Sequence, residues 1–354
     1  MEISALWAVG MLLAAFAGGA FGAALGALPA FIFTGFLVIA GETANVVGQA
    51  VVQMTGMAAA DLPVLGITGS IGFGPVFGPH ISFAGGAAAA AYSAKMGHMD
   101  TGFPYHEAKN IAFAQGPKPD VLIVGGLFGI LGYWITTISS GMSLPWDPIA
   151  IGVVLSALAH RLIFKFPIIG EAKKGLLNIS PFEEDEKRVI GEAATAEKDG
   201  ERRLLVEPWL PHQYKWADVT ILGLVVGMLA AFTTYKTGSI FLPFGISAAS
   251  LLFLNCGVSN IPVTHHISLL GSTAPLAATT GDITSASLVF VLLIGGLFGM
   301  IAANFGELTE RIFFMHSDTH WDPPASAIVI TTLIVVLLAA IGVFPDTSWV
   351  PTPF

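Results

Sequence analysis

The chain has 354 residues, of which 54% are hydrophobic and only 11% are charged, with a formal net charge of −9. A soluble globular protein carries about a quarter charged residues, so this composition excludes an ordinary soluble enzyme and an intrinsically disordered chain. Residues 165–207 hold 18 of the 39 charged residues. Nearly half of the charge is therefore concentrated in one polar stretch and not spread over the apolar segments. The sequence therefore predicts an integral protein of the lipid bilayer.

Apolar segments long enough for membrane helices occupy most of the chain. A span needs roughly 20 mostly apolar residues whose backbone groups bond to one another, which favours α-helices. The chain begins without the basic region of a cleaved signal peptide, so we expect its first apolar run to be a retained span. Eight segments have the required composition: residues 6–25, 29–40, 121–138, 148–164, 217–232, 240–254, 286–305 and 325–344.

Two further apolar segments contain helix-breaking residues. Residues 62–94 carry no charge, yet Pro75 and Pro79 interrupt any single helix, and a second piece is expected to begin near Pro79. Residues 263–280 contain a similar break near His266. We therefore expect two discontinuous helices in addition to the eight continuous ones.

Two polar stretches separate the apolar segments. Residues 41–61 place apolar residues at helical spacing with glutamines opposite, which predicts an amphipathic helix lying at the membrane interface. Residues 165–215 contain dense charge and a central region without aromatic residues, which predicts a solvated linker.

The two halves of the chain share five motifs in the same order, which indicates a tandem duplication. The predicted fold is an all-α polytopic membrane protein of about ten transmembrane helices, built as two five-helix repeats with discontinuous helices near Pro79 and His266. The expected domains are a membrane repeat at residues 1–164, a cytoplasmic linker at 165–215 and a second membrane repeat at 216–354. The matched motifs are Val9-Gly10-Met11 with Val226-Gly227-Met228, Leu28-Pro29 with Leu242-Pro243, Pro79-His80-Ile81-Ser82 with His265-His266-Ile267-Ser268, the Gly-Gly-Leu-Phe-Gly runs at 125–129 and 295–299, and Trp146-Asp147-Pro148 with Trp321-Asp322-Pro323.

Basic residues indicate the orientation, because Lys and Arg accumulate on the cytoplasmic side of membrane proteins. With five crossings in each half the halves are inverted, and the loops at 95–120, 161–215 and 306–323 are cytoplasmic; they hold 3, 10 and 1 of the 15 basic residues. If the broken segments are re-entrant hairpins, the halves are parallel instead, and residues 161–215 remain cytoplasmic. We expect a multi-pass protein of a prokaryotic plasma (inner) membrane.

Inverted repeats with discontinuous helices are the recurring design of secondary transporters. Two half-helix N-termini that face each other create a positive potential without any Arg or Lys in the membrane. The sequence therefore predicts a secondary active transporter, a symporter that couples a small anionic or polar metabolite to H⁺ or Na⁺. The structural alternative is that these glycines and prolines only permit close packing and that the histidines bond to carbonyl groups. The expected substrate-binding residues are Gly78, His80, Ser82, Thr264, His265, His266 and Ser268.

Polar residues at the edges of apolar segments are candidates for ion coupling, with solvated helix ends as the alternative. They are Glu42, Asp61 and Asn255. His and Asp alternate in the loop 316–322, but no metal-site spacing fits, so no metal and no cofactor are expected.

Other function classes receive less support. No phosphate-binding loop, kinase signature or hydrolase motif occurs, so enzymatic activity is not expected, and nucleic acid is not an expected partner. The alternative function is a non-catalytic membrane subunit that anchors a larger complex or conducts ions. Gly125 with Gly129 and Gly295 with Gly299 predict close helix packing, within the chain or between the subunits of a homo-oligomer.

Overall fold

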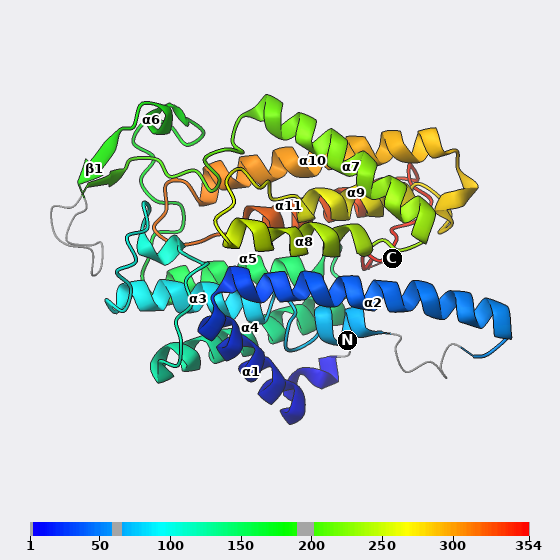
Figure 1. Ribbon diagram of the computed structural model, residues 1–354, viewed down its shortest axis with the longest axis horizontal. Coiled ribbons are helices and arrows are strands. Elements are labelled where there is room, and N and C mark those ends of the chain that lie inside the picture. The colour runs from blue at the N-terminus through cyan, green and yellow to red at the C-terminus, as the bar shows by residue number, and fades with distance from the viewer. Residues whose placement is uncertain (1–2, 59–65, 190–201, 354) are drawn as a thin grey trace.

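A computed structural model describes residues 3–58, 66–189 and 202–353, most of which are helical (Figure 1). By length and composition the protein is a helical membrane-associated protein, in agreement with the sequence. Five helices are long and apolar enough to cross a membrane: α2 (Ala27–Thr55), α4 (Pro119–Gly141), α7 (Trp216–Thr237), α10 (Leu288–Phe313) and α11 (Pro323–Ala340).

Shorter helices complete the two halves, and each of the eight predicted continuous segments coincides with a helix. The first half adds η1 (Ile3–Trp7), α1 (Val9–Leu25), η3 (Thr68–Gly72), α3 (Ser82–Lys95), η4 (Glu107–Lys109) and α5 (Pro148–Ile163). The second half adds α8 (Leu242–Asn255), α9 (His265–Ala277) and η5 (Ile283–Ser285). Between the halves lie α6 (Ser180–Glu183) and an antiparallel pair of strands, β1 (Lys187–Val189) and β2 (Arg202–Leu204).

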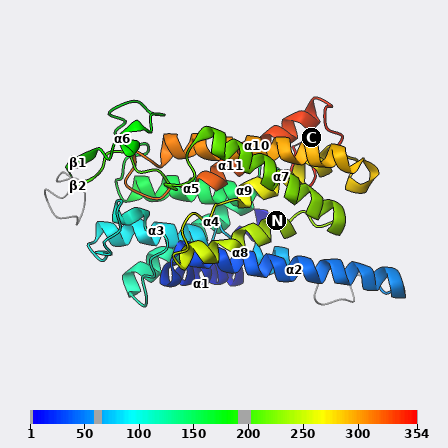
Figure 2. The same ribbon diagram turned by 45° about the horizontal axis from the view of Figure 1, so that its top comes forward.

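The helices of each half pack against one another in the same way. In the first half α3 packs against both α1 and α4, which also contact each other; in the second half α9 packs against both α7 and α10, which likewise contact each other. The halves meet where α2 packs against α8 and α5 against α11. Figures 1 and 2 show the first half on one side of the molecule and the second half on the other.

The helices α3 and α9 are too short to cross a bilayer. They contain 14 and 13 residues, and at about 1.5 Å per residue each is near 20 Å long, whereas the hydrocarbon core is about 30 Å thick. They begin at Ser82 and His265, close to the predicted breaks at Pro79 and His266. Both are buried over almost their whole length.

The repeated Trp-Asp-Pro motif starts α5 and α11. The Asp147 carboxylate accepts hydrogen bonds from the backbone N–H groups of Ile149 and Ala150 at 2.7 and 2.9 Å, and proline occupies the first helical position. Asp322 accepts one from the N–H of Ala325 at 2.8 Å. The motif is therefore a helix cap. The tryptophan of the second copy, Trp321, is buried at 5% exposure.

Glycines allow the closest helix crossings. A Cβ at Gly129 of α4 would lie 2.2 Å from the carbonyl oxygen of Ala15 on α1, and one at Gly299 of α10 would lie 2.2 Å from that of Gly223 on α7. A Cβ at Gly125 or Gly295 would also clash with the neighbouring helix. These glycines are therefore used for close packing within the chain, which is one of the two alternatives that the sequence leaves open.

Adding one methyl group at such a crossing is expected to destabilise the protein. Gly129→Ala must push α1 and α4 apart because the clash is with backbone, and overpacking of this kind costs about 1–3 kcal/mol. Gly10→Ala on α1 is the matched control, since nothing lies within 4 Å of its Cβ and alanine favours a helix. Thermal unfolding in detergent compares the two; equal melting temperatures would contradict this packing.

Two sequence interpretations require correction. Residues 41–55 do not form a separate interfacial helix, because α2 continues without interruption to Thr55 and projects past the other helices (Figure 1); residues 59–61 of the predicted segment lie outside the described residues. The linker is not solvated throughout, because Val206, Glu207 and Leu210 are buried at 2%, 1% and 7% exposure. Apolar residues of the linker pack against the helical halves and draw this charged segment inward.

Candidate functional site

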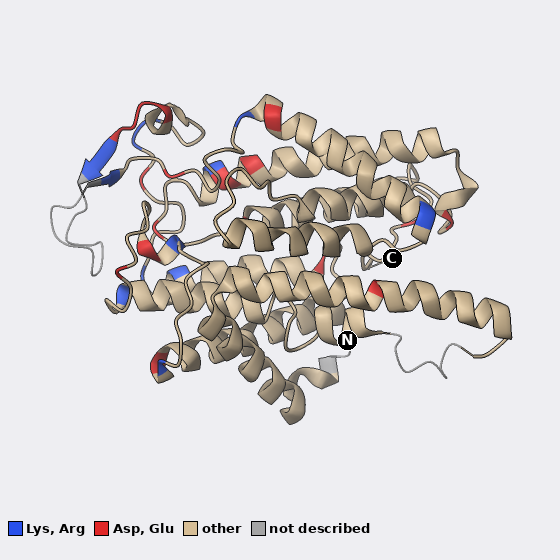
Figure 3. Cartoon of the chain, viewed as in Figure 1, with Lys and Arg blue, Asp and Glu red and all other residues tan. Residues whose placement is uncertain are grey.

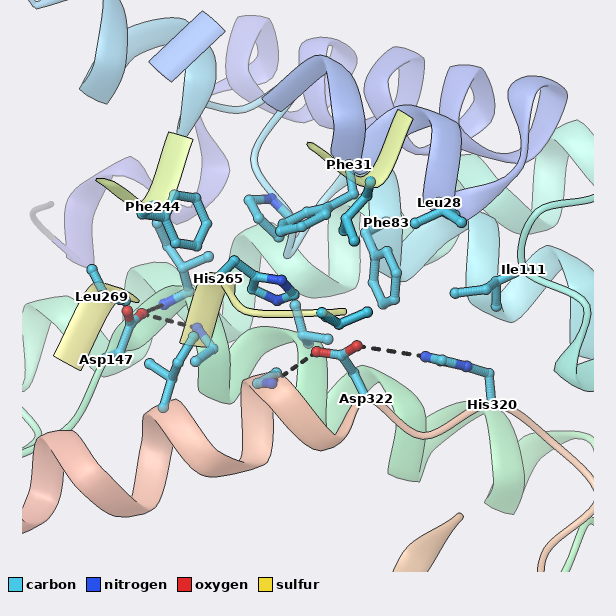
Figure 4. Close-up of a pocket in the computed structure, with 18 of the residues that line it drawn as sticks. Leu28, Phe31, Phe83, Ile111, Asp147, Phe244, His265, Leu269, His320 and Asp322 are labelled. Carbon is cyan, nitrogen blue, oxygen red and sulfur yellow. Dashed lines mark hydrogen bonds and ion pairs between the residues drawn. The ribbon is translucent and has the colours of Figure 1, made fainter. Parts of the chain in front are cut away.

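A cavity of about 640 Å³ lies between the two halves (Figure 4). Helices α2, α3 and α5 of the first half and α8, α9 and α11 of the second all contribute to its wall. Five pairs of lining residues occupy matching positions when the shared motifs are aligned: Pro79 with His265, Phe83 with Leu269, Asp147 with Asp322, Ala150 with Ala325, and Val153 with Ile328.

The wall is mainly apolar and aromatic. The ring centroids of Phe31 and Phe83 are 6.0 Å apart, and those of Phe31 and Phe244 are also 6.0 Å apart. Pockets of this size and character hold small organic molecules and use a few polar groups to orient them. The other aromatic lining residues are Phe73, Phe103, Tyr105, Trp209, Phe241, Phe314 and Trp349.

Few polar side chains reach the cavity. Figure 4 shows Asp147 and Asp322 on one side, with His265 and the phenylalanine rings opposite. The Nε2 atom of His320 lies 3.6 Å from Oδ1 of Asp322. Burial lowers the pKa of His320 although Asp322 opposes the shift, so this imidazole is neutral at pH 7.

The N-terminus of α9 opens toward this cavity. Thr264 makes no side-chain capping bond, and the His265 ring lies 4.7 Å from that of Phe31, centroid to centroid. The corresponding start of α3 is closed, because the N–H groups of Ile81 and Ser82 donate to the carbonyl of Gly78. Only one of the two predicted half-helix N-termini is therefore free to contact a ligand.

Of the seven predicted substrate-binding residues, His265 alone lines the cavity. The hydroxyl of Ser82 donates to the Phe77 carbonyl at 3.3 Å, and that of Ser268 donates to the His265 carbonyl at 3.1 Å. These serine hydroxyls are therefore bonded to carbonyl groups near their own helix starts. The remaining four residues, Gly78, His80, Thr264 and His266, also lie outside the cavity wall.

The two predicted ion-coupling residues that the structure describes, Glu42 and Asn255, lie near opposite ends of α8. Glu42 is 6% exposed and accepts hydrogen bonds from Thr68 Oγ1 at 2.6 Å, Asn45 Nδ2 at 3.0 Å and the Ser239 hydroxyl. Asn255 is exposed at the end of α8. Asp61 lies outside the described residues.

An ion pair that sequence reasoning missed contributes to the cavity wall. Lys109 lines the cavity, and its Nζ lies 2.7 Å from Oε2 of Glu207, with side-chain exposures of 0% and 2%. Burial lowers the pKa of Lys109 and raises that of Glu207. The charge of each residue and the hydrogen bond between them oppose both shifts. The residues are 98 positions apart, so no local pattern in the sequence could have paired them.

Charged residues gather around this pair, at the end of the molecule that carries β1 (Figure 3). Asp318 accepts from Arg188 at 2.7 Å and also from Arg203. The alternating His and Asp loop is therefore held by arginines. In the part of the chain that the structure describes, no three His, Cys, Asp or Glu side chains gather as metal ligands do.

Comparison with known protein families matches the sequence of the chain to one family. The chain belongs to the DUF7973 family. The family is described as one of unknown function, and its sequence profile matches residues 1–353. No curated protein and no solved structure matches the chain.

Proposed function

We propose that the protein is a secondary active transporter of a small anionic or polar metabolite, coupled to H⁺ or Na⁺, with its substrate in the cavity between the halves. The observation that carries this proposal is the origin of the lining, since matching positions of both halves contribute to one cavity of about 640 Å³. A transporter built from repeats holds its substrate at their interface, so that rocking one repeat against the other exposes the site to each side in turn.

The proposed architecture is two five-helix repeats that together cross the membrane about ten times. It is supported by the shared motifs and by the equivalent packing of α1, α3 and α4 and of α7, α9 and α10. The short buried helices α3 and α9 occupy the places of the discontinuous helices. One face of α7 carries an apolar stripe of Ile221, Val225 and Leu229, each of which is more than half exposed. Such a stripe suits contact with lipid.

We propose a multi-pass protein of a prokaryotic plasma membrane, and the distribution of charges supports its orientation. The loops proposed to be cytoplasmic meet in the charged cluster, where Lys109, Glu207 and Asp318 come from three different loops. The basic residues of this cluster lie at one end of the molecule, which agrees with the accumulation of Lys and Arg on the cytoplasmic side.

The lining narrows the proposed substrate class. Aromatic walls favour a molecule with an apolar body, and the uncapped start of α9 with His265 favours a carboxylate or another acceptor group at one end. The proposed substrate is therefore a small carboxylate or similarly polar metabolite with an apolar part. A cavity of this size favours transport over the alternative function of an anchoring subunit, which requires none.

Uptake by reconstituted protein tests this function. Liposomes containing the purified protein are expected to accumulate a radiolabelled carboxylate, with phenylacetate, butyrate and succinate as probes, faster than protein-free liposomes under an inward H⁺ or Na⁺ gradient. Val153→Trp fills the cavity from α5 and is expected to abolish uptake. Leu155→Trp on the same helix is the control, since Leu155 is 39% exposed away from the cavity. Equal uptake by both variants would contradict the proposed site.

A further inference from the structure

A second and much smaller cavity lies on the other side of the first turn of α9. Its volume of about 10 Å³ is close to the space that one water molecule needs. Its wall contains three ionisable side chains, His266 from α9 and Glu307 and Glu310 from α10, which are 2%, 4% and 2% exposed. Sequence reasoning did not single out either glutamate.

The two carboxyl groups lie close together in a buried site. Glu307 and Glu310 are one helical turn apart on α10 and line one cavity with room for about one water molecule. Two like charges in such a site repel strongly, as in other carboxyl pairs that hold a single proton. This placement favours one bound proton on the pair.

The neighbours identify Glu310 as the acid that carries this proton. Glu307 Oε1 accepts from Nε of Arg311 at 2.6 Å, so this cation neutralises Glu307. The other guanidinium nitrogens of Arg311 donate to the carbonyls of Leu177 and Tyr214. Among the described residues, Glu310 accepts a hydrogen bond from a neutral backbone N–H, that of Trp209 at 3.0 Å. Its carboxyl group is therefore the one left to carry the proton.

His266 is placed to exchange this proton. Its ring is buried with Nε2 toward Gly306 of α10, and it lines the same small cavity as the two acids. Its ring centroid lies 5.7 Å from that of His265, which faces the large cavity. The first turn of α9 thus presents one imidazole to each cavity.

The first half offers no equivalent acid pair. Aligned on the shared Gly-Gly-Leu-Phe-Gly run, the positions of Glu307 and Glu310 are occupied by Thr137 and Ser140. His80 is the counterpart of His266 in the aligned motif and is also buried, but it lacks these acids beside it. His80 is therefore a matched control for His266.

We propose that Glu310, Glu307 and His266 form a proton-binding site that couples proton movement to the transport cycle. The exchange step breaks the O–H bond of Glu310 and forms an N–H bond on the imidazole of His266 through one water, which leaves a carboxylate and an imidazolium and conserves charge. Besides these groups, the titratable or charged groups that face Glu310 in the described residues are Arg311 on α10 and Tyr105 on the loop before η4. The coupling role rests on the proposed transport function, whereas the bound proton does not.

Infrared spectroscopy of the purified protein tests the bound proton without any substrate. At neutral pH the wild type is expected to show the carbonyl stretch of a protonated carboxylic acid, and Glu310→Gln, which keeps the size of the side chain, is expected to lose that band. Glu42→Gln, which changes a buried carboxylate with three donors, is expected to retain the band. Glu310→Asp, which keeps an acid, is expected to shift it. A wild type without the band, or a Glu310→Gln protein that retains it in full, would overturn the site.

The same band tests the role of His266. His266→Gln is expected to shift the frequency of the Glu310 carbonyl because the hydrogen bonding in the shared cavity changes, whereas His80→Gln is expected to leave it in place. An unchanged band in the His266→Gln protein would remove His266 from the proposed site.

Proteoliposome uptake tests the coupling separately. Under an inward proton gradient, Glu310→Gln is expected to take up the carboxylate probe at least about tenfold more slowly than the wild type, because a neutral amide cannot release a proton. At equal pH on both sides of the membrane, the variant is still expected to exchange the probe. Full gradient-driven uptake by this variant would overturn the coupling role. Absence of uptake by the wild type would overturn the transport function and the coupling together, and the infrared result would still decide whether Glu310 holds a proton.

Discussion

Replacing Lys109 by methionine is expected to lower the free energy of unfolding by about 3–5 kcal/mol, because removing one partner leaves the other charge buried and uncompensated. Both side chains are almost completely buried, and the Nζ of Lys109 lies 2.7 Å from Glu207. Lys109 also lies over the ring of Phe314 at 4.4 Å from its centroid, a contact that is lost with the charge. Denaturation in detergent, followed by circular dichroism, measures the loss.

Controls separate the buried charge from a general effect of lost lysine. Lys174→Met breaks an ion pair with Glu186 in which the lysine side chain is 50% exposed, so it is expected to cost less than about 1 kcal/mol. The double variant Lys109→Met with Glu207→Leu is expected to recover part of the loss, because neither charge is then left buried alone. A double variant as unstable as the sum of the two single variants would show that the residues do not act as a pair.

Replacing Arg161 by methionine is expected to be the second most damaging change, with a loss of more than about 3 kcal/mol, because several buried acceptors are left without a donor. The side chain is 0% exposed at the end of α5. Its guanidinium donates to Thr319 Oγ1 at 2.8 Å, to Ser317 Oγ at 2.7 Å and to the Thr319 carbonyl at 3.0 Å. It also donates to the carbonyl of Ile168, so it holds two loops against one helix.

The geometry of the guanidinium, and not only its charge, is expected to matter. Arg161→Lys is predicted to restore little of the lost stability, because a lysine ammonium group cannot donate to several acceptors in the fixed directions that a planar guanidinium provides. Arg188→Met is the control: its side chain is 24% exposed, and its partner Asp318 keeps Arg203, so a loss below about 1 kcal/mol is expected. Equal losses for Arg161→Met and Arg188→Met in thermal unfolding would contradict this assignment.

Much of the helical framework could be predicted because its causes are local. Apolar runs and their breaks located the helices, and an aspartate before a proline located the starts of α5 and α11, since a cap needs only residues within one turn. The extent of α2 was misjudged for a local reason too. The amphipathic residues beyond Gly41 continue the helix, and nothing in the sequence stops it before Thr55.

The candidate site was predicted only in part, because a motif does not reveal which way its side chains face. The sequence singled out the first turn of α9, and there His265 faces the large cavity whereas the next residue, His266, faces a different one. Ser82 and Ser268 looked available for a ligand, but each donates to a nearby carbonyl, a bond that serine hydroxyls readily form at helix starts.

The sequence by itself determined the membrane character, the positions of the helices, the caps and the glycines that permit close approach, because each follows from composition or from neighbours within a few residues. Only the tertiary structure decided which groups meet: Lys109 with Glu207, Arg161 with the loop at Thr319, and His266 with Glu310. These partners come from separate elements. Their contacts depend on how buried helices pack, and burial makes each unpaired charge costly enough to select one arrangement.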